Sequence, residues 1–199
     1  MICMHWPRRP FSLLFAGLLA AAMAAPSHAA DWDMDQLMRT LAQTRSGQAR
    51  FVEKKTIAIL EQPVESSGEL LYTAPDRLEK RTIKPKPETM VVQGDNLEID
   101  RGRQKIKLQL QEYPELAAFI DSIRGTLAGD RKALERSYQL SLEGSAQSWT
   151  LRLVPVGSKM KQVVALIRIT GTRDELRSID VTQVDGDRSL MLIEKVGSP

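Results

Sequence analysis

The feature that most constrains the fold of this chain is a series of eleven short runs that read as β-strands. In residues 103–111, Ile106, Leu108 and Leu110 alternate with lysine and glutamine. A period of two is typical of a strand with one dry and one wet face, and evenly spaced runs with turn signals between them predict an antiparallel sheet. The runs span residues 49–61, 68–74, 77–84, 88–95, 96–100, 103–111, 138–143, 147–154, 162–170, 176–184 and 188–196.

Helical spacing occurs in two places. Residues 31–46 predict a helix with Asp31 or Asp33 as its cap and Gly47 just past its end. Residues 114–127 predict a second helix with Pro114 in its first turn, and residues 130–136 a short third one. The apolar stripes consist of Met34, Leu37, Met38 and Leu41 in the first helix, and of Leu116, Phe119, Ile120, Ile123 and Leu127 in the second.

These elements together predict a mainly β (α+β) fold. Because exposed sheet edges are usually avoided by closure or covering, we expect a single curved antiparallel sheet. It would form an incomplete, half-open β-barrel of about 11 strands, with the helices as a lid over its concave apolar face. Helices that cover such a face imperfectly leave an apolar cavity, which suits an acyl chain.

The first residues predict a targeting segment rather than part of the fold. Arg8 and Arg9 precede an apolar stretch over residues 11–25, and small residues follow at 27–29. This is the pattern of a cleaved secretory signal peptide, whose apolar stretch is short for a membrane span. We therefore expect a signal peptide over residues 1–29, by the general or the twin-arginine route, and one exported domain over residues 30–199.

The residues that remain after such cleavage do not favour an enzyme. Cys3, His5 and His28 all lie in the predicted signal peptide, so the commonest general base and the commonest transition-metal ligands are missing. Asp185 to Asp187 are read as a hairpin turn rather than a calcium loop. With Arg8 and Arg9 removed, the charges nearly balance, without a basic patch for nucleic acid. We expect no catalytic residue, no metal, no cofactor and no nucleic-acid partner.

The order of motifs resembles one known family, the outer-membrane lipoprotein carrier protein LolA. The resemblance rests on "ARFVEKK", where Glu53 stands in the place of a frequent glutamine, on a middle "PELAAFIDSI" and on the closing "LRSIDVTQVDGDRSLMLIEK". It also rests on a run that contains Gly68, Leu70, Pro75, Leu78, Pro85 and Gly94.

The resemblance implies a monomeric periplasmic carrier in a Gram-negative bacterium. Such a carrier binds the acyl chains of lipoproteins, or of related lipids, in an apolar cavity. It takes them from an inner-membrane ABC-type donor to an outer-membrane acceptor. The alternative is a periplasmic lipid- or lipoprotein-sensing adaptor of the same half-barrel fold that regulates a partner protein.

One departure from the family pattern concerns the lid. An arginine that latches the lid in the family corresponds to Ala74 here, and an aromatic pair corresponds to Leu78 and Lys80. Arg77 or Arg81 is a candidate substitute for the latch.

The expected acyl-chain site follows from the alternation in the first half of the sheet. The predicted binding residues on the concave face are Leu70, Tyr72, Leu78, Met90, Val92, Ile106 and Leu108. The predicted lid residues are Met34, Leu37, Met38, Leu41, Leu116, Phe119, Ile120 and Ile123.

Overall fold

A computed structural model describes residues 32–197, and within them one sheet contains eleven strands. All neighbouring strands are antiparallel, in the order β6-β5-β4-β3-β2-β1-β11-β10-β9-β8-β7. Strands β6 and β7 lie at the two edges and are not paired with each other, so the barrel is not closed. The predicted fold class, an open antiparallel barrel with a few helices, is confirmed. The predicted signal peptide lies outside the described residues.

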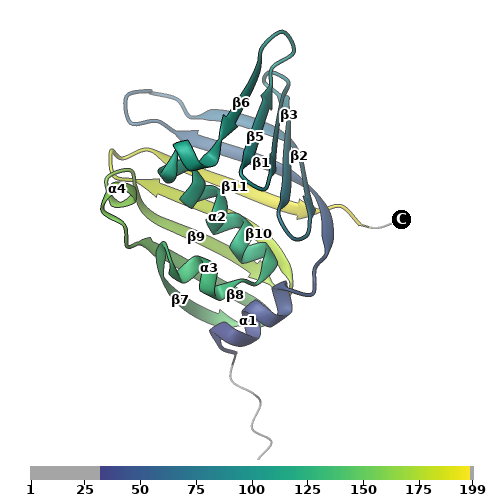
Figure 1. Cartoon of the computed structure of the whole chain (residues 1–199), viewed down its shortest axis with the longest axis vertical. Coiled ribbons are helices and arrows are strands. Elements are labelled where there is room, and N and C mark those ends of the chain that lie inside the picture. Colours follow the sequence, from purple (N-terminus) through teal and green to yellow (C-terminus); the bar gives the residue numbers. More distant parts are fainter. Residues whose placement is uncertain (1–31, 198–199) are drawn as a thin grey trace, which may run out of the picture. The chain divides into compact units, whose positions relative to one another are not determined.

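In chain order the strands run from the middle of the sheet out to one edge, β1 to β6, and then from the opposite edge back to the middle, β7 to β11 (Figure 1). Strand β1 therefore pairs with the last strand, β11, as well as with β2. The strands are β1 (Ser46–Thr56), β2 (Val64–Thr73), β3 (Arg77–Lys84), β4 (Glu88–Gln93), β5 (Asn96–Asp100), β6 (Lys105–Gln109), β7 (Tyr138–Ser145), β8 (Ser148–Pro155), β9 (Val164–Thr172), β10 (Glu175–Gln183) and β11 (Arg188–Lys195).

The helices begin at the signals that the sequence contains. The side chain of Asp33 accepts a hydrogen bond from the backbone of Gln36 and caps α1. Pro114 is in the first turn of α2, and Gly129 ends α2 in the left-handed conformation at φ 65°. The helices are α1 (Met34–Leu41), α2 (Pro114–Ala128), α3 (Arg131–Glu135) and α4 (Ser158–Lys161), with a 3₁₀ turn η1 at Leu110–Glu112.

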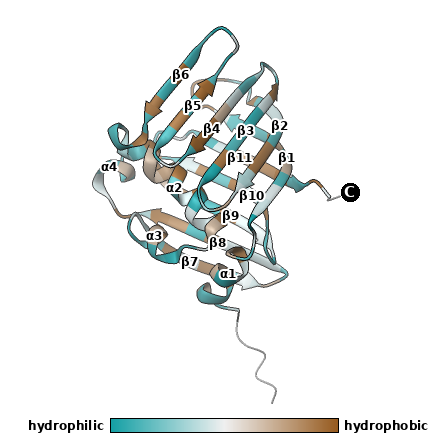
Figure 2. Cartoon of the chain, turned by 45° about the vertical axis from the view of Figure 1, so that its right-hand side comes forward, coloured by the Kyte–Doolittle hydropathy of each residue, from teal (hydrophilic) through white to brown (hydrophobic). Residues whose placement is uncertain are grey.

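The apolar core is divided into two parts on the face that the helices cover, which we call the inner face. The larger part joins α1 and α3 to strands β7–β10, and includes Trp149, Leu151 and Ile167. The smaller part lies under α2 and η1, and consists of Val92, Leu97, Leu110 and Ile120. Figure 2 shows hydrophobic and hydrophilic stretches side by side on β4, β5 and β6, as expected for strands with one packed face.

Two boundaries near the start of the chain differ from the predicted ones. The first helix ends at Leu41 rather than at residue 46, and Gly47 lies in β1 opposite Tyr72 instead of past the helix end. The ladder between β1 and β2 provides the backbone hydrogen bonds that a longer helix would have made. Strand β1 also stops at Thr56, because a hydrogen bond from Leu60 to the Ile57 carbonyl turns the chain.

The predicted first strand, residues 49–61, was too long at its end because apolar residues follow this turn. Ile57, Ile59 and Leu60 continue an apolar pattern, but they form a loop, and the Ile59 side chain is 91% exposed. The loop is held against the β10–β11 turn, since Asp187 accepts a hydrogen bond from the backbone of Ala58. Asp185 to Asp187 therefore form a turn, as predicted. The short helix α4 was not predicted.

Candidate functional site

A cavity of about 660 Å³ lies on the inner face, between the two parts of the core. Its wall includes Val92 and Ile120 from the smaller part, and Met160 and Val164 from the larger part. Phe119 of α2 packs against both parts and also lines the cavity. The volume is within the range of about 300–1,000 Å³ that is typical of small-molecule sites.

The cavity exists because the middle of the sheet carries small side chains on its inner face. In β1 and β2 these are Gly47, Ala49, Ser66 and Gly68, of which Gly47 and Ala49 line the cavity. The ring of Phe51, opposite Gly68, is the large buried side chain among them. Large side chains at these positions would join the two parts of the core. The inner face of the sheet therefore carries large apolar side chains toward its two edges and leaves a hollow over its central strands, which we call the hollow centre.

Nine of the predicted residues lie around this cavity. They are Leu70, Tyr72, Leu78, Met90 and Val92 from β2–β4, and Leu116, Phe119, Ile120 and Ile123 from α2. Their shared position agrees with the alternation of the strands and the helical spacing from which they were predicted, and their role in acyl binding is a proposal that we take up below.

The other predicted residues do not line the cavity. Ile106 and Leu108 are half-buried on the edge strand β6, and Leu108 packs on the smaller part of the core. The apolar stripe of α1 packs into the larger part: Leu37, Met38 and Leu41 are buried there and Met34 lies against it. Helix α1 thus covers the end of the sheet near β7–β9 rather than the hollow centre.

The opposite wall of the cavity comes from the last strands, which the sequence reasoning left out of the site. Its inward residues are Leu176, Ile179 and Val181 of β10, together with Met191 and Ile193 of β11. The alternation in both strands is visible in the sequence. What was missing is the pairing of β11 with β1, which brings the end of the chain beside its beginning.

The most unusual group in the wall is a buried carboxylate. Glu53 points to the inner face and is only 5% exposed. Its Oε2 accepts hydrogen bonds from Lys80 Nζ at 2.5 Å and from the Ser66 hydroxyl at 3.3 Å, and its Oε1 accepts one from the Ser189 hydroxyl at 2.7 Å. Lys55 Nζ lies 3.6 Å from Oε1.

These contacts keep Glu53 ionised. Burial is the largest single influence and by itself raises the pKa of Glu53. The hydrogen bonds from Lys80 and Ser189, with the positive charges of Lys80 and Lys55, outweigh it, so the pKa of Glu53 is lowered from its ordinary value of 4.5. The carboxylate is thus charged at neutral pH in a wall that is lined mainly by apolar side chains.

A second polar group in the wall is the hydroxyl of Tyr72. The side chain is 6% exposed, and its hydroxyl has no hydrogen-bond partner among the described residues. Burial raises the pKa of this phenol.

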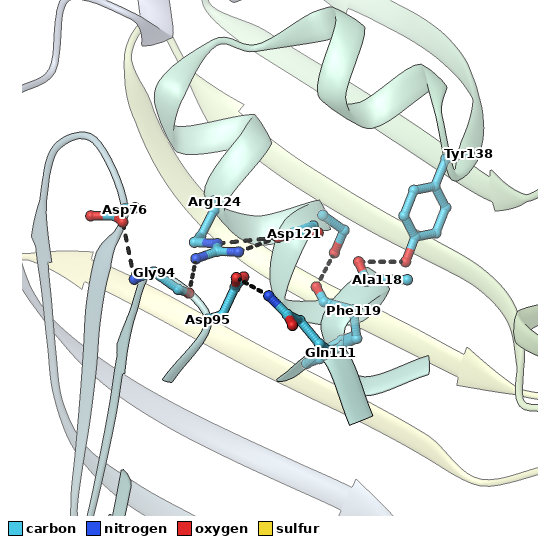
Figure 3. A network of polar contacts seen from close by, with 10 residues as sticks. Asp76, Gly94, Asp95, Gln111, Ala118, Phe119, Asp121, Arg124 and Tyr138 are labelled. Carbon is cyan, nitrogen blue, oxygen red and sulfur yellow. Dashed lines mark hydrogen bonds and ion pairs between the residues drawn. The ribbon is translucent and has the colours of Figure 1, made fainter. Parts of the chain in front are cut away.

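A polar clasp joins α2 to the turn between β4 and β5 (Figure 3). Arg124 Nη1 donates a hydrogen bond of 2.5 Å to the Gly94 carbonyl, and Arg124 also pairs with Asp121 one turn earlier. The amide of Gly94 donates to Asp76 in the β2–β3 turn at 3.0 Å. Arg124 is the half-buried residue that ties the helix to the sheet at this point.

The clasp does not come from the arginines considered in the sequence. Arg77 pairs with Glu79 and Gln93, and Arg81 pairs with Glu79 and Glu69, all of them on the strands. Neither makes a hydrogen bond or ion pair to a helix among the described residues. The arginine that joins α2 to the sheet is Arg124, which lies on α2 itself. The helical spacing of apolar residues in the sequence did not indicate it.

Two features are absent from residues 32–197. No group of three or more histidine, cysteine, aspartate or glutamate side chains in this range has a metal-binding arrangement. None of the helices in the same range has the length and apolar character needed to cross a bilayer.

The family to which these features point is found by comparison with family models. Residues 24–197 match the family described as outer membrane lipoprotein carrier protein LolA-like. The chain belongs to this LolA-like family. The resemblance drawn from the motifs is thereby confirmed, and the description of the family is that of a carrier protein. A search of curated proteins gave no match for this LolA-like chain.

Several solved structures are similar to the LolA-like chain. A LolA superfamily protein from Nitrosomonas europaea is 11% identical, with 82% of this chain and 93% of that one covered and a TM-score of 0.40. A chain in the MucA/MucB complex of Pseudomonas aeruginosa is 16% identical, with 84% and 58% covered and a TM-score of 0.48. This chain therefore spans little more than half of that relative. The lipoprotein LppX of Mycobacterium tuberculosis is 9% identical, with 81% and 93% covered and a TM-score of 0.42.

Proposed function

We propose that the protein is a periplasmic carrier that holds the acyl chains of a lipoprotein, or of a related lipid, in the cavity between the two parts of its core. It takes this cargo from an inner-membrane ABC-type donor to an outer-membrane acceptor, as a monomer and without catalysis. The observation that carries the proposal is the cavity itself, about 660 Å³ in volume and lined mainly by apolar side chains from β2–β4, α2, β10 and β11.

The chemistry of the wall matches this cargo. Each methylene that leaves water contributes about 0.8 kcal/mol, so a long acyl chain supplies ample free energy of binding without any directional contact. A carrier must also release its cargo, and the apolar wall is covered by α2, which a few polar contacts hold to the sheet. Opening that helix would expose the cavity, and it would also separate Phe119 and Ile120 from the apolar core.

The cavity also reaches a surface suited to contact with a membrane or an acceptor. Ile57 lines the cavity, and the adjoining loop exposes Ile59 and Leu60, while Val163 and Val184 are exposed nearby on the loops before β9 and after β10. Exposed apolar side chains that gather in this way are typical of interaction sites.

The proposed function is tested by an exchange experiment. The purified protein is incubated with inner-membrane vesicles that contain an acylated lipoprotein and the donor transporter, and the supernatant is analysed for a soluble one-to-one complex. We expect such a complex, and we expect it to deliver the lipoprotein to outer-membrane vesicles. Stable binding to one periplasmic protein without any lipid transfer would contradict the carrier and favour the adaptor.

Loosening the clasp is expected to speed up release. In the Arg124→Gln variant the charged hydrogen bond to the Gly94 carbonyl is lost, and such bonds contribute about 1.5–3 kcal/mol. We therefore expect an acyl probe to leave the cavity at least about tenfold faster, as measured by stopped-flow transfer to vesicles. Arg177→Gln is the control, because Arg177 pairs with Glu175 on its own strand. Equal release rates in the two variants would show that the clasp does not hold the lid.

A further inference from the structure

The cavity wall contains the ion pair between Glu53 and Lys80, which binding of an acyl chain alone does not require. We propose that Lys80, held by Glu53, binds the anionic head group, a carboxylate or a phosphate, of an amphiphile whose acyl chain fills the apolar part of the cavity. This inference rests on the proposed function and names the chemical class of the cargo.

The side chain of Lys80 extends over the inner face of the sheet, from β3 to β1, and so lies within the cavity wall. Lys80 stands on the inner face of β3 opposite Leu70, and its ammonium group reaches Glu53 on β1, two strands away. On the way to Glu53 the Lys80 side chain passes over Gly68, which lies on the inner face of β2 opposite Phe51 of β1. A Cβ at Gly68 would lie 1.9 Å from the Arg81 carbonyl oxygen and 3.0 Å from the Phe51 ring, so the site requires glycine there.

The ammonium group of Lys80 has N–H donors that are not used within the described residues. An ammonium group offers three N–H donors, and among the described residues its one acceptor is Glu53 Oε2, with the Phe51 ring centroid at 4.8 Å. The carboxylate, by contrast, already accepts three hydrogen bonds, from Lys80, Ser66 and Ser189. The polar group that remains available to a ligand in this part of the wall is therefore a cationic donor.

The charges immediately around Lys80 favour an anion. Lys80 and Lys55 both approach Glu53, so two positive charges face one negative charge at this part of the cavity. Other charged residues of the lining have partners elsewhere: Arg188 is held by Asp180, and Asp187 accepts from the backbone of Ala58. Lys195 pairs with Glu175, and Glu79 pairs with Arg77 and Arg81. Glu115 and Asp174 also line the cavity, so the positive excess is local to Lys80 and Lys55. A head group with one negative charge would neutralise the excess.

Stability alone does not account for the pair. Charged groups taken out of water are costly, and apolar residues of similar volume often serve a protein as well or better in such places. A buried ion pair in a wall whose exposed area is mainly apolar is therefore better explained by a polar partner that enters the cavity.

The test compares three probes of equal chain length: hexadecanoic acid, its methyl ester and hexadecyl phosphate. Each displaces a neutral fluorescent acyl probe from the whole protein near pH 7.5. We expect one or both anions to bind at least about tenfold more tightly than the ester, since hydrogen bonds to charged groups are roughly twice as strong as neutral ones. The preferred anion identifies the head group.

The variant is the double substitution Glu53→Gln with Lys80→Met, which removes both charges and leaves no buried charge without its partner. We expect it to lose the preference for the anions, so that the anions bind no more tightly than the methyl ester does to the same variant. Lys107→Met is the matched control, because Lys107 is an exposed lysine on β6 that pairs with Glu98 and does not line the cavity. It should keep the preference.

The outcomes separate this inference from the carrier proposal. If the ester binds and the anions bind no better, or if their preference survives in the double variant, the head-group site is wrong and the acyl cavity stands. If none of the three probes binds, both proposals are overturned.

Discussion

Replacing Met191 by tryptophan is expected to abolish acyl binding while the protein stays folded. Met191 lies on the inner face of β11, opposite Glu53 of β1 and Ile179 of β10, in the hollow centre of the sheet. A tryptophan ring there extends into empty space rather than into a packed core. If it displaces about four methylenes of the ligand, the lost burial of about 3 kcal/mol weakens binding by at least about 100-fold.

The neighbouring residue supplies the control for this experiment. Leu192 follows Met191 on the same strand, points to the opposite face and is 56% exposed. Leu192→Trp therefore adds the same side chain to the outside of the sheet. Titration of an acyl probe, with circular dichroism to check folding, should separate the two variants. Equal affinities would mean that acyl chains do not occupy the space in front of Met191.

Breaking the Glu53–Lys80 pair from one side is expected to give the largest loss of stability. In Lys80→Met the carboxylate keeps its two hydroxyl partners and the more exposed Lys55, but it loses its closest cation. An uncompensated buried charge costs about 3–5 kcal/mol, so we expect a loss of up to that size. The double variant with Glu53→Gln removes that charge and should recover most of the loss. Urea unfolding of the two single variants and the double variant measures this coupling. Additive effects would contradict the role assigned to the pair.

The same pair predicts how stability depends on pH. Because the pKa of Glu53 is lower in the folded protein than its ordinary value of 4.5, the unfolded chain takes up a proton more readily than the folded one. The contribution of Glu53 to stability is therefore fully present above about pH 4.5 and is lost as the pH falls through the lower, folded-state value. Glu53→Gln should flatten the acid side of the pH–stability profile. An unchanged slope would show that other carboxylates cause it.

Much of the fold could be predicted because its signals are local. Alternation identifies the inward residues of each strand without knowledge of its partners, as at Ile106 and Leu108, and Asp33 and Pro114 mark helix starts by their own chemistry. Local signals also set the limits. The apolar residues Ile57, Ile59 and Leu60 resemble a strand, and only their position at a turn held by Asp187 shows that they form a loop.

The candidate site depends on contacts between distant parts of the chain, so the sequence predicted only half of it. The inward residues of β2–β4 and α2 lie around the cavity, whereas Met191 and Ile193 escaped notice because β11 pairs with β1 across the whole length of the chain. The same holds for Glu53. As a residue on a strand it had no visible partner, and Lys80 reaches it only because Gly68 leaves the wall between them bare.

The measurement that tests the central claim most directly is a calorimetric titration of the purified protein with saturated fatty acids of increasing length. If an apolar cavity takes up the acyl chain, each pair of added methylenes strengthens binding by roughly tenfold until the cavity is full, with one ligand per chain and a negative heat-capacity change. Affinity that does not depend on chain length, or no binding at all, would contradict the claim that this sheet and its lid hold an acyl chain.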